Sequence, residues 1–441
     1  MKADPSPPAI SLHSLGQNHA HGVDPQRLRE INRWVILNAL RTQGPSSRTR
    51  LTKQTRLSAT TLTSIVRELV EQQWIKEIGS LQAEQNARWS GGRQAIEVAF
   101  NARAGAVIGG QIGRTELRLL LTDLTGHCLK ASEPIKLETA IGPDRYLPQL
   151  LAALDDFVRG VVTWEQVFGI GLGIPGPLDN TFRPNSPPGM SAWDGRDIVA
   201  ELAACAQGTF NPRTMPIYLE NEAKFGALGE SWYGAGRSPG RDNVAYVKVG
   251  SGVGAGFVLQ RQLYRGNTGT AGELGHSRLD RGDSQEHRVC ACGKVDCLEA
   301  YTSVNGILQD VRAITGEAGL TIERVIERAK IRADGQISAD AIELAGRRLG
   351  AAIGSLINML DPAVVVIDGQ IPQHAGDLLL HPLIETAREH SFHREPLTSI
   401  ELSSLEGYAI AWGGVAKVID TLFLSPPLPT ARPLRESAGR A

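Results

Sequence analysis

The sequence VAYVKVGSGVGAGFVL, residues 244–259, combines an apolar strand, a glycine loop and an apolar return strand. β-Branched and aromatic residues favour strands, and glycines permit the tight turn between them. Similar segments recur at 106–113, 167–177 and 364–369, with helical patterns between them. Strands paired through tight turns and interrupted by helices predict an α/β fold with two lobes. The glycine loops suit backbone binding of phosphate, although any tight hairpin also requires glycine.

The composition is that of a globular protein. Of 441 residues, 41% are hydrophobic, and no apolar run approaches the roughly 20 residues that span a bilayer. Five cysteines do not form a disulfide framework, so we expect a cytoplasmic protein without a membrane segment. Cys128 and Cys205 lie in apolar stretches and are expected to be core residues. Residues 1–25 and 425–441 are Pro-rich and are expected to be flexible tails.

Residues 26–100 begin with the pattern of a helix-turn-helix. A first amphipathic helix should end before Pro45, and a short second helix should cover roughly residues 48–55. Ser58 can then cap a third helix. This third helix turns a set of apolar residues inward, namely Leu62, Ile65, Val66, Leu69 and Val70.

The outward face of the third helix suits the major groove of DNA. Ser and Thr side chains can bond phosphates and base edges, and their small size allows close approach. A β-hairpin wing with glycines at its tip should follow, ending in a strand at 95–100. The predicted DNA contacts are Ser47, Arg48, Ser58, Thr60, Thr61, Thr63, Ser64, Arg67 and Arg93.

Charge is divided unequally along the chain, although the net charge is −1. Residues 26–94 contain twelve Arg or Lys residues and five Glu residues, a net charge of about +7 that leaves about −8 for the rest. A basic module on an acidic body is typical of a DNA-binding head. A small helical module that binds another protein is the alternative.

Three of the five cysteines, Cys290, Cys292 and Cys297, fall within eight residues. With one histidine they make a four-coordinate Cys3His set, which zinc favours. Such a site has no open position for water, so the expected role of the zinc is structural. His276 and His287 are both candidates for the fourth ligand.

Together these segments resemble the ROK family of repressors and sugar kinases, in its DNA-binding branch. The resemblance covers roughly residues 27 to 424 and rests on the winged helix and the motifs GIPGP, ENEA, GSGVG, GELGH and CxCGxxxCLE, in that order. It implies an actin-like, two-lobed body behind a winged helix at 26–100. The first lobe would comprise 104–220 and 400–424, and the second lobe, with the zinc site, 221–399.

The resemblance also implies which residues form the sites. A sugar would lie between the lobes and contact Asn221, Glu222, Glu273, His276 and Glu299. Carboxylates and amides suit this task because they bond several hydroxyls at once. The resemblance favours His276 over His287, so the zinc ligands would be His276, Cys290, Cys292 and Cys297.

Three positions depart from the kinases of this family. Gln111 stands where the kinases have an aspartate in the first phosphate loop, and Glu222 replaces their catalytic aspartate. Residues 368–370 interrupt the glycine run expected near the adenosine pocket. Phosphoryl transfer depends on exact positioning and on neutralisation of phosphate charge through Mg²⁺. We therefore expect a protein that binds sugar but does not phosphorylate it.

The sequence thus predicts a sugar-responsive transcriptional repressor. A glutamate after Asn221, here Glu222, is more similar to the pattern of xylose-type repressors than to that of glucose-type kinases. A homodimer or homotetramer would place two heads on a palindromic operator. An active sugar kinase with an accessory head and a repressor controlled by a protein partner are the alternatives. The identity of the sugar, and whether it releases or strengthens DNA binding, stay open.

Overall fold

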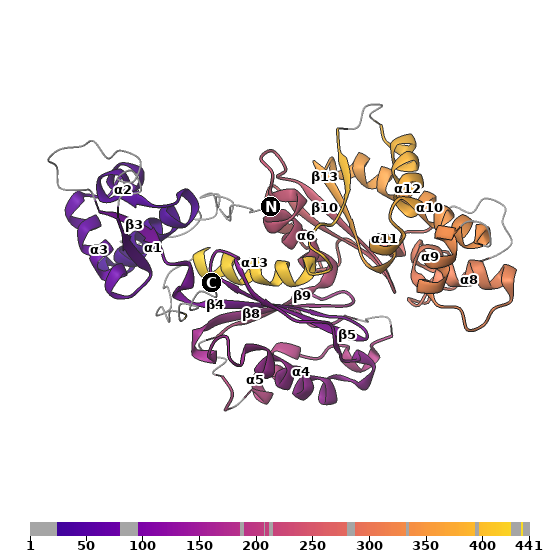
Figure 1. Cartoon of the computed structure of the whole chain (residues 1–441), viewed down its shortest axis with the longest axis horizontal. Helices are drawn as coiled ribbons and strands as arrows, with labels where there is room; N and C mark the ends of the chain where they lie inside the picture. The colour runs from indigo at the N-terminus through magenta and orange to yellow at the C-terminus, as the bar shows by residue number, and fades with distance from the viewer. Residues whose placement is uncertain are drawn as a thin grey trace.

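The chain forms an N-terminal head and a two-lobed α/β body, as seen in a computed structural model (Figure 1). The structure describes residues 24–79, 96–185, 189–206, 208–210, 215–279, 287–331, 335–392, 397–424 and 434. Within these ranges, no helix has both the length and the hydropathy that a membrane crossing requires. Most of the two expected tails and the wing tip with Arg93 lie outside the described residues.

In its described residues, 24–79 and 96–100, the head has three helices and a small antiparallel sheet. Its elements are α1 (Pro25–Gln43), β1 (Ser46–Ser47), α2 (Arg48–Thr55), α3 (Ala59–Glu71), β2 (Ile75–Ile78) and β3 (Glu97–Phe100). The strand order is β1-β3-β2, so β2 and β3 form the base of the predicted hairpin. Asp24, Ser47 and Ser58 cap the three helices, because each side-chain oxygen accepts a backbone N–H of the first turn.

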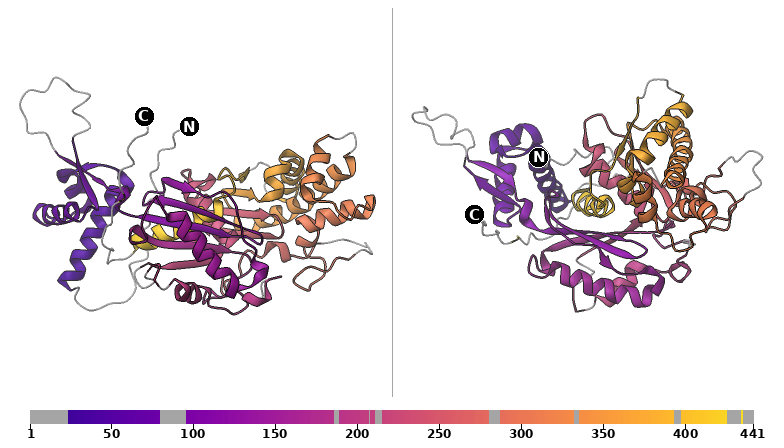
Figure 2. Two further views of the ribbon diagram at one scale, coloured as in Figure 1. Left: turned by 60° about the horizontal axis from the view of Figure 1, so that its bottom comes forward. Right: turned by 45° about the vertical axis from the view of Figure 1, so that its right-hand side comes forward.

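The first lobe contains a mixed sheet in the order β6-β5-β4-β8-β9, with β7 paired to β5. Its strands are β4 (Ala106–Ile112), β5 (Glu116–Asp123), β6 (Cys128–Ala131), β7 (Ile135–Lys136), β8 (Val167–Ile174) and β9 (Ile217–Asn221). Helices α4 (Pro143–Val158) and α5 (Ile198–Cys205) cover one face, and α13 (Ala409–Leu424) covers the other (Figure 2). Because both faces are covered, β8 is buried along its whole length.

The second lobe repeats this topology with the strand order β12-β11-β10-β13-β14. The strands are β10 (Val244–Val249), β11 (Val253–Leu259), β12 (Gln262–Tyr264), β13 (Val364–Asp368) and β14 (Ser399–Leu402). The helices are α7 (Glu299–Thr302), α8 (Val304–Thr315), α9 (Ile322–Ile331), α10 (Gln336–Leu360), α11 (Gln370–Ala375) and α12 (Asp377–His390). The repeated topology agrees with the predicted actin-like body.

Helices α6 (Glu222–Tyr233) and α13 pack against each other between the two sheets (Figure 2). Each helix follows the last strand of one lobe. Their close approach depends on glycine: a Cβ at Gly229 would lie 2.0 Å from the carbonyl oxygen of Ala409. Likewise, a Cβ at Gly413 would lie 1.8 Å from the carbonyl oxygen of Phe225. The two helices are therefore packed backbone to backbone.

Two expectations are wrong. Residues 400–402 belong to β14, which pairs with β13, so the chain returns to the first lobe only after Leu402. Cys128 and Cys205 are exposed and not part of the core. Cys128 lies on an edge strand and Cys205 ends a surface helix. Apolar neighbours in sequence do not decide burial, because successive strand residues point to opposite faces and a surface helix buries only one side.

Candidate functional site

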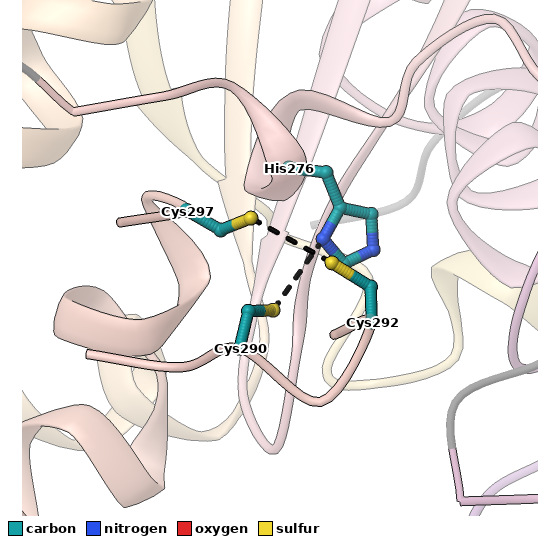
Figure 3. Close-up of side chains that lie close together, drawn as sticks. All are labelled: His276, Cys290, Cys292 and Cys297. Atoms are coloured by element: carbon teal, nitrogen blue, oxygen red, sulfur yellow. Dashed lines mark hydrogen bonds between the residues drawn. The ribbon is translucent and has the colours of Figure 1, made fainter. Parts of the chain in front are cut away.

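Four potential metal ligands come together in the second lobe (Figure 3). The sulfur atoms of Cys290, Cys292 and Cys297 and a ring nitrogen of His276 all lie within 4.8 Å of one another. Cys290 Sγ is 3.6 Å from His276 Nδ1, and Cys292 Sγ is 3.7 Å from Cys297 Sγ. Tetrahedral zinc with Zn–S bonds of ~2.3 Å and Zn–N bonds of ~2.0 Å needs ligand separations of about 3.5–3.8 Å. The donor set and its spacing therefore fit zinc.

A tight turn brings Cys290 and Cys292 onto the same side of the site. The turn closes through hydrogen bonds from Cys290 N to Lys294 O (2.8 Å) and from Gly293 N to Cys290 O (2.9 Å). Gly293 has φ +83°, a conformation that glycine adopts readily. Burial raises the pKa of Cys290 to about 12. A thiolate at this buried position therefore needs a bound cation to offset the loss of hydration.

His287 lies outside this cluster. Its Nδ1 is 2.7 Å from Oδ2 of Asp296, whose Oδ1 accepts a hydrogen bond from the Tyr301 hydroxyl at 2.6 Å. The hydrogen bond from Tyr301 is the largest of the effects that lower the pKa of Asp296 to about 2. His287 thus pairs with a carboxylate, whereas His276 faces the cysteines.

Two carboxylates border the cysteine cluster. Glu273 Oε2 is 3.8 Å from Nε2 of His276, and Glu299 Oε1 is 3.6 Å from Sγ of Cys290. The other oxygen of Glu299 accepts the backbone N–H of Val253 at 2.8 Å, which ties α7 to the glycine loop after β10. The imidazole of His276 therefore stands between the cysteines and Glu273.

Asn221 lies at the junction of β9 and α6. Its Oδ1 accepts the backbone N–H groups of Ala223 and Lys224 at 3.0 and 3.2 Å, and its Nδ2 donates to Gly176 O at 2.8 Å. Asn221 therefore caps α6 and anchors the GIPGP loop, and it is 7% exposed. Asn221 therefore contributes to the site by fixing the GIPGP loop relative to the start of α6.

Charged groups of both lobes pair beside Asn221. Glu222, the first residue of α6, pairs with Lys248 near the end of β10. Arg265, which follows β12, lies 2.9 Å from Oε2 of Glu220 and donates to Asp179 O at 3.0 Å. These pairs place charged groups of both lobes at the carboxyl ends of their strands, where ligands bind in α/β sheets.

Two positions at which the sequence departs from the expected kinase pattern lie on β4 and at the end of β13. Gln111 lies on β4 with a neutral carboxamide. Asp368 is 4% exposed and accepts hydrogen bonds from the Tyr246 hydroxyl at 2.7 Å, Gly369 N at 2.7 Å and Gln373 Nε2 at 3.1 Å. The carboxylate of Asp368 is thus engaged in holding the start of α11.

A cavity of about 460 Å³ lies away from these residues. Its lining includes Arg241, Ala363, Arg388 and Thr398, at the amino ends of β13 and β14 and beside α12. The predicted sugar contacts lie instead at the carboxyl ends of the strands. We therefore assign no role in sugar binding to this cavity.

The outward face of α3 carries exposed polar side chains. Thr60, Thr63 and Arg67 are exposed, whereas Thr61 is half-buried. Ser58 Oγ accepts the backbone N–H of Thr61 at 3.1 Å and lies 2.8 Å from its hydroxyl. Ser58 therefore caps the helix. Thr60, Thr63 and Arg67 are the predicted DNA contacts that α3 exposes to solvent.

Three other predicted DNA contacts have partners within the head. Ser47 caps α2, and Arg48 forms a 2.7 Å ion pair with Glu77. Ser64 accepts a hydrogen bond from Arg29 of α1 at 3.2 Å, so it faces α1 and not the outer surface. The helical rotation of about 100° per residue places Ser64 on the side next to α1.

Sequence reasoning missed two lysines of the site. Lys248 is the one charged residue of β10, and a charge inside an apolar strand before a glycine loop was an available signal. Lys224 is fully buried, and among the described residues its ammonium has no hydrogen-bond partner. Burial lowers the pKa of Lys224, while the charges of Glu220 and Glu273 oppose that shift. No local pattern marked Lys224.

A basic winged-helix head on a two-lobed body with a Cys3His cluster defines a class of regulators built on a sugar-kinase fold. The chain belongs to the ROK family, which matches residues 107–418.

Its curated relatives include several repressors. The chain is 28% identical to a putative xylose repressor of Caldicellulosiruptor sp. (strain Rt8B.4), over 90% of this chain and 98% of the relative. It is 29% identical to the xylose repressor of Bacillus subtilis, over 81% and 85% of the two chains. It is also 26% identical to the transcriptional dual regulator NagC of Escherichia coli, over 84% and 87%.

Solved structures share the fold. A ROK family transcriptional regulator, described as a homologue of the E. coli MLC protein, matches with a TM-score of 0.70 and 24% identity, over 90% of this chain and 97% of the other. A ROK family glucokinase from Streptomyces griseus matches with a TM-score of 0.60 and 23% identity, over 71% of this chain and 99% of the other. The match to the regulator covers more of this chain.

Proposed function

We propose that this protein is a sugar-responsive transcriptional regulator, most simply a cytoplasmic repressor of carbohydrate-utilisation genes. The head would bind operator DNA, and the residues between the lobes would bind a sugar without phosphorylating it. The observation that carries the proposal is that Glu273 and Glu299 both border the cysteine cluster, on a chain whose head exposes Thr60, Thr63 and Arg67. The repressor names of its relatives support the same function.

The cysteine cluster would hold a structural zinc ion. Zinc bound by Cys290, Cys292, Cys297 and Nδ1 of His276 would supply a fixed tetrahedral anchor. The imidazole would then present Nε2 toward Glu273, and the metal would orient the sugar site without taking part in a reaction. The predicted sugar contacts Glu273 and His276 would thus depend on the zinc for their positions.

Two heads would be needed for specific DNA binding. A homodimer or homotetramer would place one α3 in each half of a palindromic operator, one helical turn or a multiple apart. A sugar that changes the relative position of the lobes would change this spacing. A rigid-body shift of that kind is sufficient to remove affinity for a fixed pair of half-sites.

Selection of genomic DNA fragments by the full chain, with and without D-xylose, tests the proposal. D-Xylose is the first choice because the relatives include xylose repressors. We expect selected fragments to lie beside carbohydrate genes, and the sugar to change their affinity by about tenfold or more. If the chain selects no DNA fragment over the others, the proposal of a transcriptional regulator is contradicted. A preference that no sugar of a hexose and pentose panel alters would instead favour a protein effector.

Glu273→Gln should weaken sugar binding about tenfold or more, because a charge-assisted hydrogen bond contributes about 1.5–3 kcal/mol. Isothermal calorimetry with D-xylose measures this, with zinc content determined in parallel. Glu317→Gln is a matched control, since Glu317 is exposed and pairs only with Arg328 among the contacts described for the second lobe. Equal affinities for both variants would remove Glu273 from the sugar site.

An assay with ATP, Mg²⁺ and a sugar panel should show no turnover above background. Gln111 cannot neutralise a metal-bound phosphate, and the carboxylate of Glu222 is held by the ammonium of Lys248. The rival function, an active sugar kinase with an accessory head, predicts turnover of about 1–100 per second. Rates in that range would show that the protein is an active kinase, and the DNA-binding head would then have a secondary, regulatory role.

A further inference from the structure

The head contacts the body at the C-terminal end of α13. Trp34 and Asn38 of α1 both donate side-chain hydrogen bonds to the backbone carbonyl of Phe423, the latter at 3.4 Å. The Phe423 ring is fully buried, 5.7 Å from the ring of Phe100 and 6.4 Å from that of Trp74. We use the name head–body joint for the group formed by Trp34, Asn38, Arg41, Tyr233, Asp420 and Phe423.

Arg41 is a buried cation of this joint whose hydrogen bonds are only partly made. It is 4% exposed and its guanidinium carbon lies 4.8 Å from the centre of the Phe423 ring. Nε donates to Asn38 Oδ1 at 3.3 Å, but among the described residues Nη1 and Nη2 have no hydrogen-bond partner. Burial lowers the pKa of Arg41 to about 10, while Tyr233 and Asp420 oppose this shift. A buried cation with unmade hydrogen bonds destabilises the arrangement that holds it.

Tyr233 and Asp420 bring the two interlobe helices to Arg41. Tyr233 is the last residue of α6, and its ring centre lies 4.5 Å from that of Trp412 of α13. Its hydroxyl is buried and, within the described part of the chain, has no hydrogen-bond partner. Asp420 belongs to α13, and burial raises its pKa. The joint therefore contains groups that could pair with Arg41 after a small shift.

Helix α6 connects this joint directly to the sugar site. It begins with the Asn221 cap and with Glu222, which pairs with Lys248 of the second lobe, and it ends at Tyr233. At 1.5 Å per residue its 12 residues span about 18 Å. Because α6 packs backbone to backbone on α13 through Gly229 and Gly413, the two helices must move together.

We propose that the sugar signal reaches the DNA-binding head through α6 and α13, with Arg41 as the group that distinguishes two positions of the head. This inference rests on the proposed function and adds its route of regulation. In the present arrangement, Arg41 stacks on Phe423 with its terminal nitrogens unbonded. Movement of the lobes around a sugar shifts the Tyr233 and Asp420 ends of the helices. Arg41 then gains a hydrogen-bonded partner, and the head rotates on α1.

The variants Arg41→Met and Tyr233→Phe test this route in the full chain. Each removes a buried polar group whose bonds are unmade, so each should stabilise the present arrangement. Operator affinity is measured on the selected genomic fragments with and without D-xylose. The sugar-induced change should fall from about tenfold or more to about threefold or less. The Kd for D-xylose in the absence of DNA should rise by linkage, so operator affinity is compared at saturating sugar. The zinc content should stay as in the unmodified chain.

Arg27→Met and Tyr264→Phe are the controls, because Arg27 is exposed on the same helix and Tyr264 is exposed on β12. Both should keep the full sugar response. Hydrogen exchange of residues 34–41 without sugar gives a readout that needs no effector, and it should be slower in both joint variants. The proposed route is contradicted if Arg41→Met and Tyr233→Phe keep the full sugar response. It is also contradicted if hydrogen exchange of residues 34–41 is unchanged in these variants. If the unmodified chain does not respond to D-xylose, the proposed effector fails and exchange alone decides the route.

Discussion

Replacing Cys297 with serine should release the zinc ion and destabilise the second lobe. Zinc should fall from about one to less than about 0.1 atom per chain, because a closed tetrahedral site needs all four ligands. Zinc coordination contributes about 10–16 kcal/mol in isolated zinc modules, and part of this is lost here. Cys297 is 1% exposed, so water cannot easily replace the thiolate. We expect Tm to fall by about 10 °C in calorimetry.

Cys128→Ser is the matched control for this prediction. Cys128 is an exposed thiol on β6, far from the cluster in sequence, and its replacement should leave zinc content and Tm unchanged. A chelator added to the unmodified chain should reproduce the effect of Cys297→Ser. Sugar affinity should fall with the zinc, since His276 lies between the cysteines and Glu273. Full zinc content in Cys297→Ser would refute the four-ligand site.

Replacing Arg67 with alanine should weaken operator binding by about 10–100-fold. Arg67 is exposed on α3, one helical turn after Thr63, on the face expected to enter the major groove. An arginine that bonds a base edge contributes about 1–3 kcal/mol of discrimination, which corresponds to this range. Fluorescence anisotropy at one fixed salt concentration measures the change, because affinity for DNA falls steeply with salt.

Arg145→Ala provides the control for charge alone. Arg145 is exposed on α4, in the acidic body, and its loss should leave operator affinity within about twofold. Arg93→Ala should weaken binding to all sequences alike and reduce the slope of affinity against salt by about one, as expected for a phosphate contact. Unchanged operator binding in both Arg67→Ala and Arg93→Ala would mean that another surface contacts DNA.

Much of the head could be predicted because its signals are local. Ser47 and Ser58 cap α2 and α3 as expected, since the hydrogen bonds of a cap join residues three positions apart. The spacing of apolar residues also placed Leu62 and Ile65 in the core. The pattern alone did not reveal that Arg29 of another helix donates a hydrogen bond to Ser64 on that side of α3.

The surroundings of the proposed sugar site were less predictable than its motifs suggested. The motifs predict its carboxylates, but they do not predict the charged groups that pair with those carboxylates. Lys248 of β10 pairs with Glu222 at the start of α6, and Lys224 is buried near the charges of Glu220 and Glu273. Ion pairs of this kind depend on how separate elements pack together, so the pattern of residues within one strand or helix does not predict them.

The sequence by itself determined the elements, the cysteine donor set and the basic charge of the head, because capping, periodicity and short motifs act between near neighbours. Residue spacing left His276 and His287 both open as the fourth ligand, and the tertiary structure places His276 at the cysteines, as the family resemblance implied. Only the tertiary structure decided how the head meets the body, through a bond between Trp34 and Phe423, which are 389 positions apart. Contacts over such separations depend on how whole elements pack, and packing follows from the shape of the assembled core and not from any local pattern.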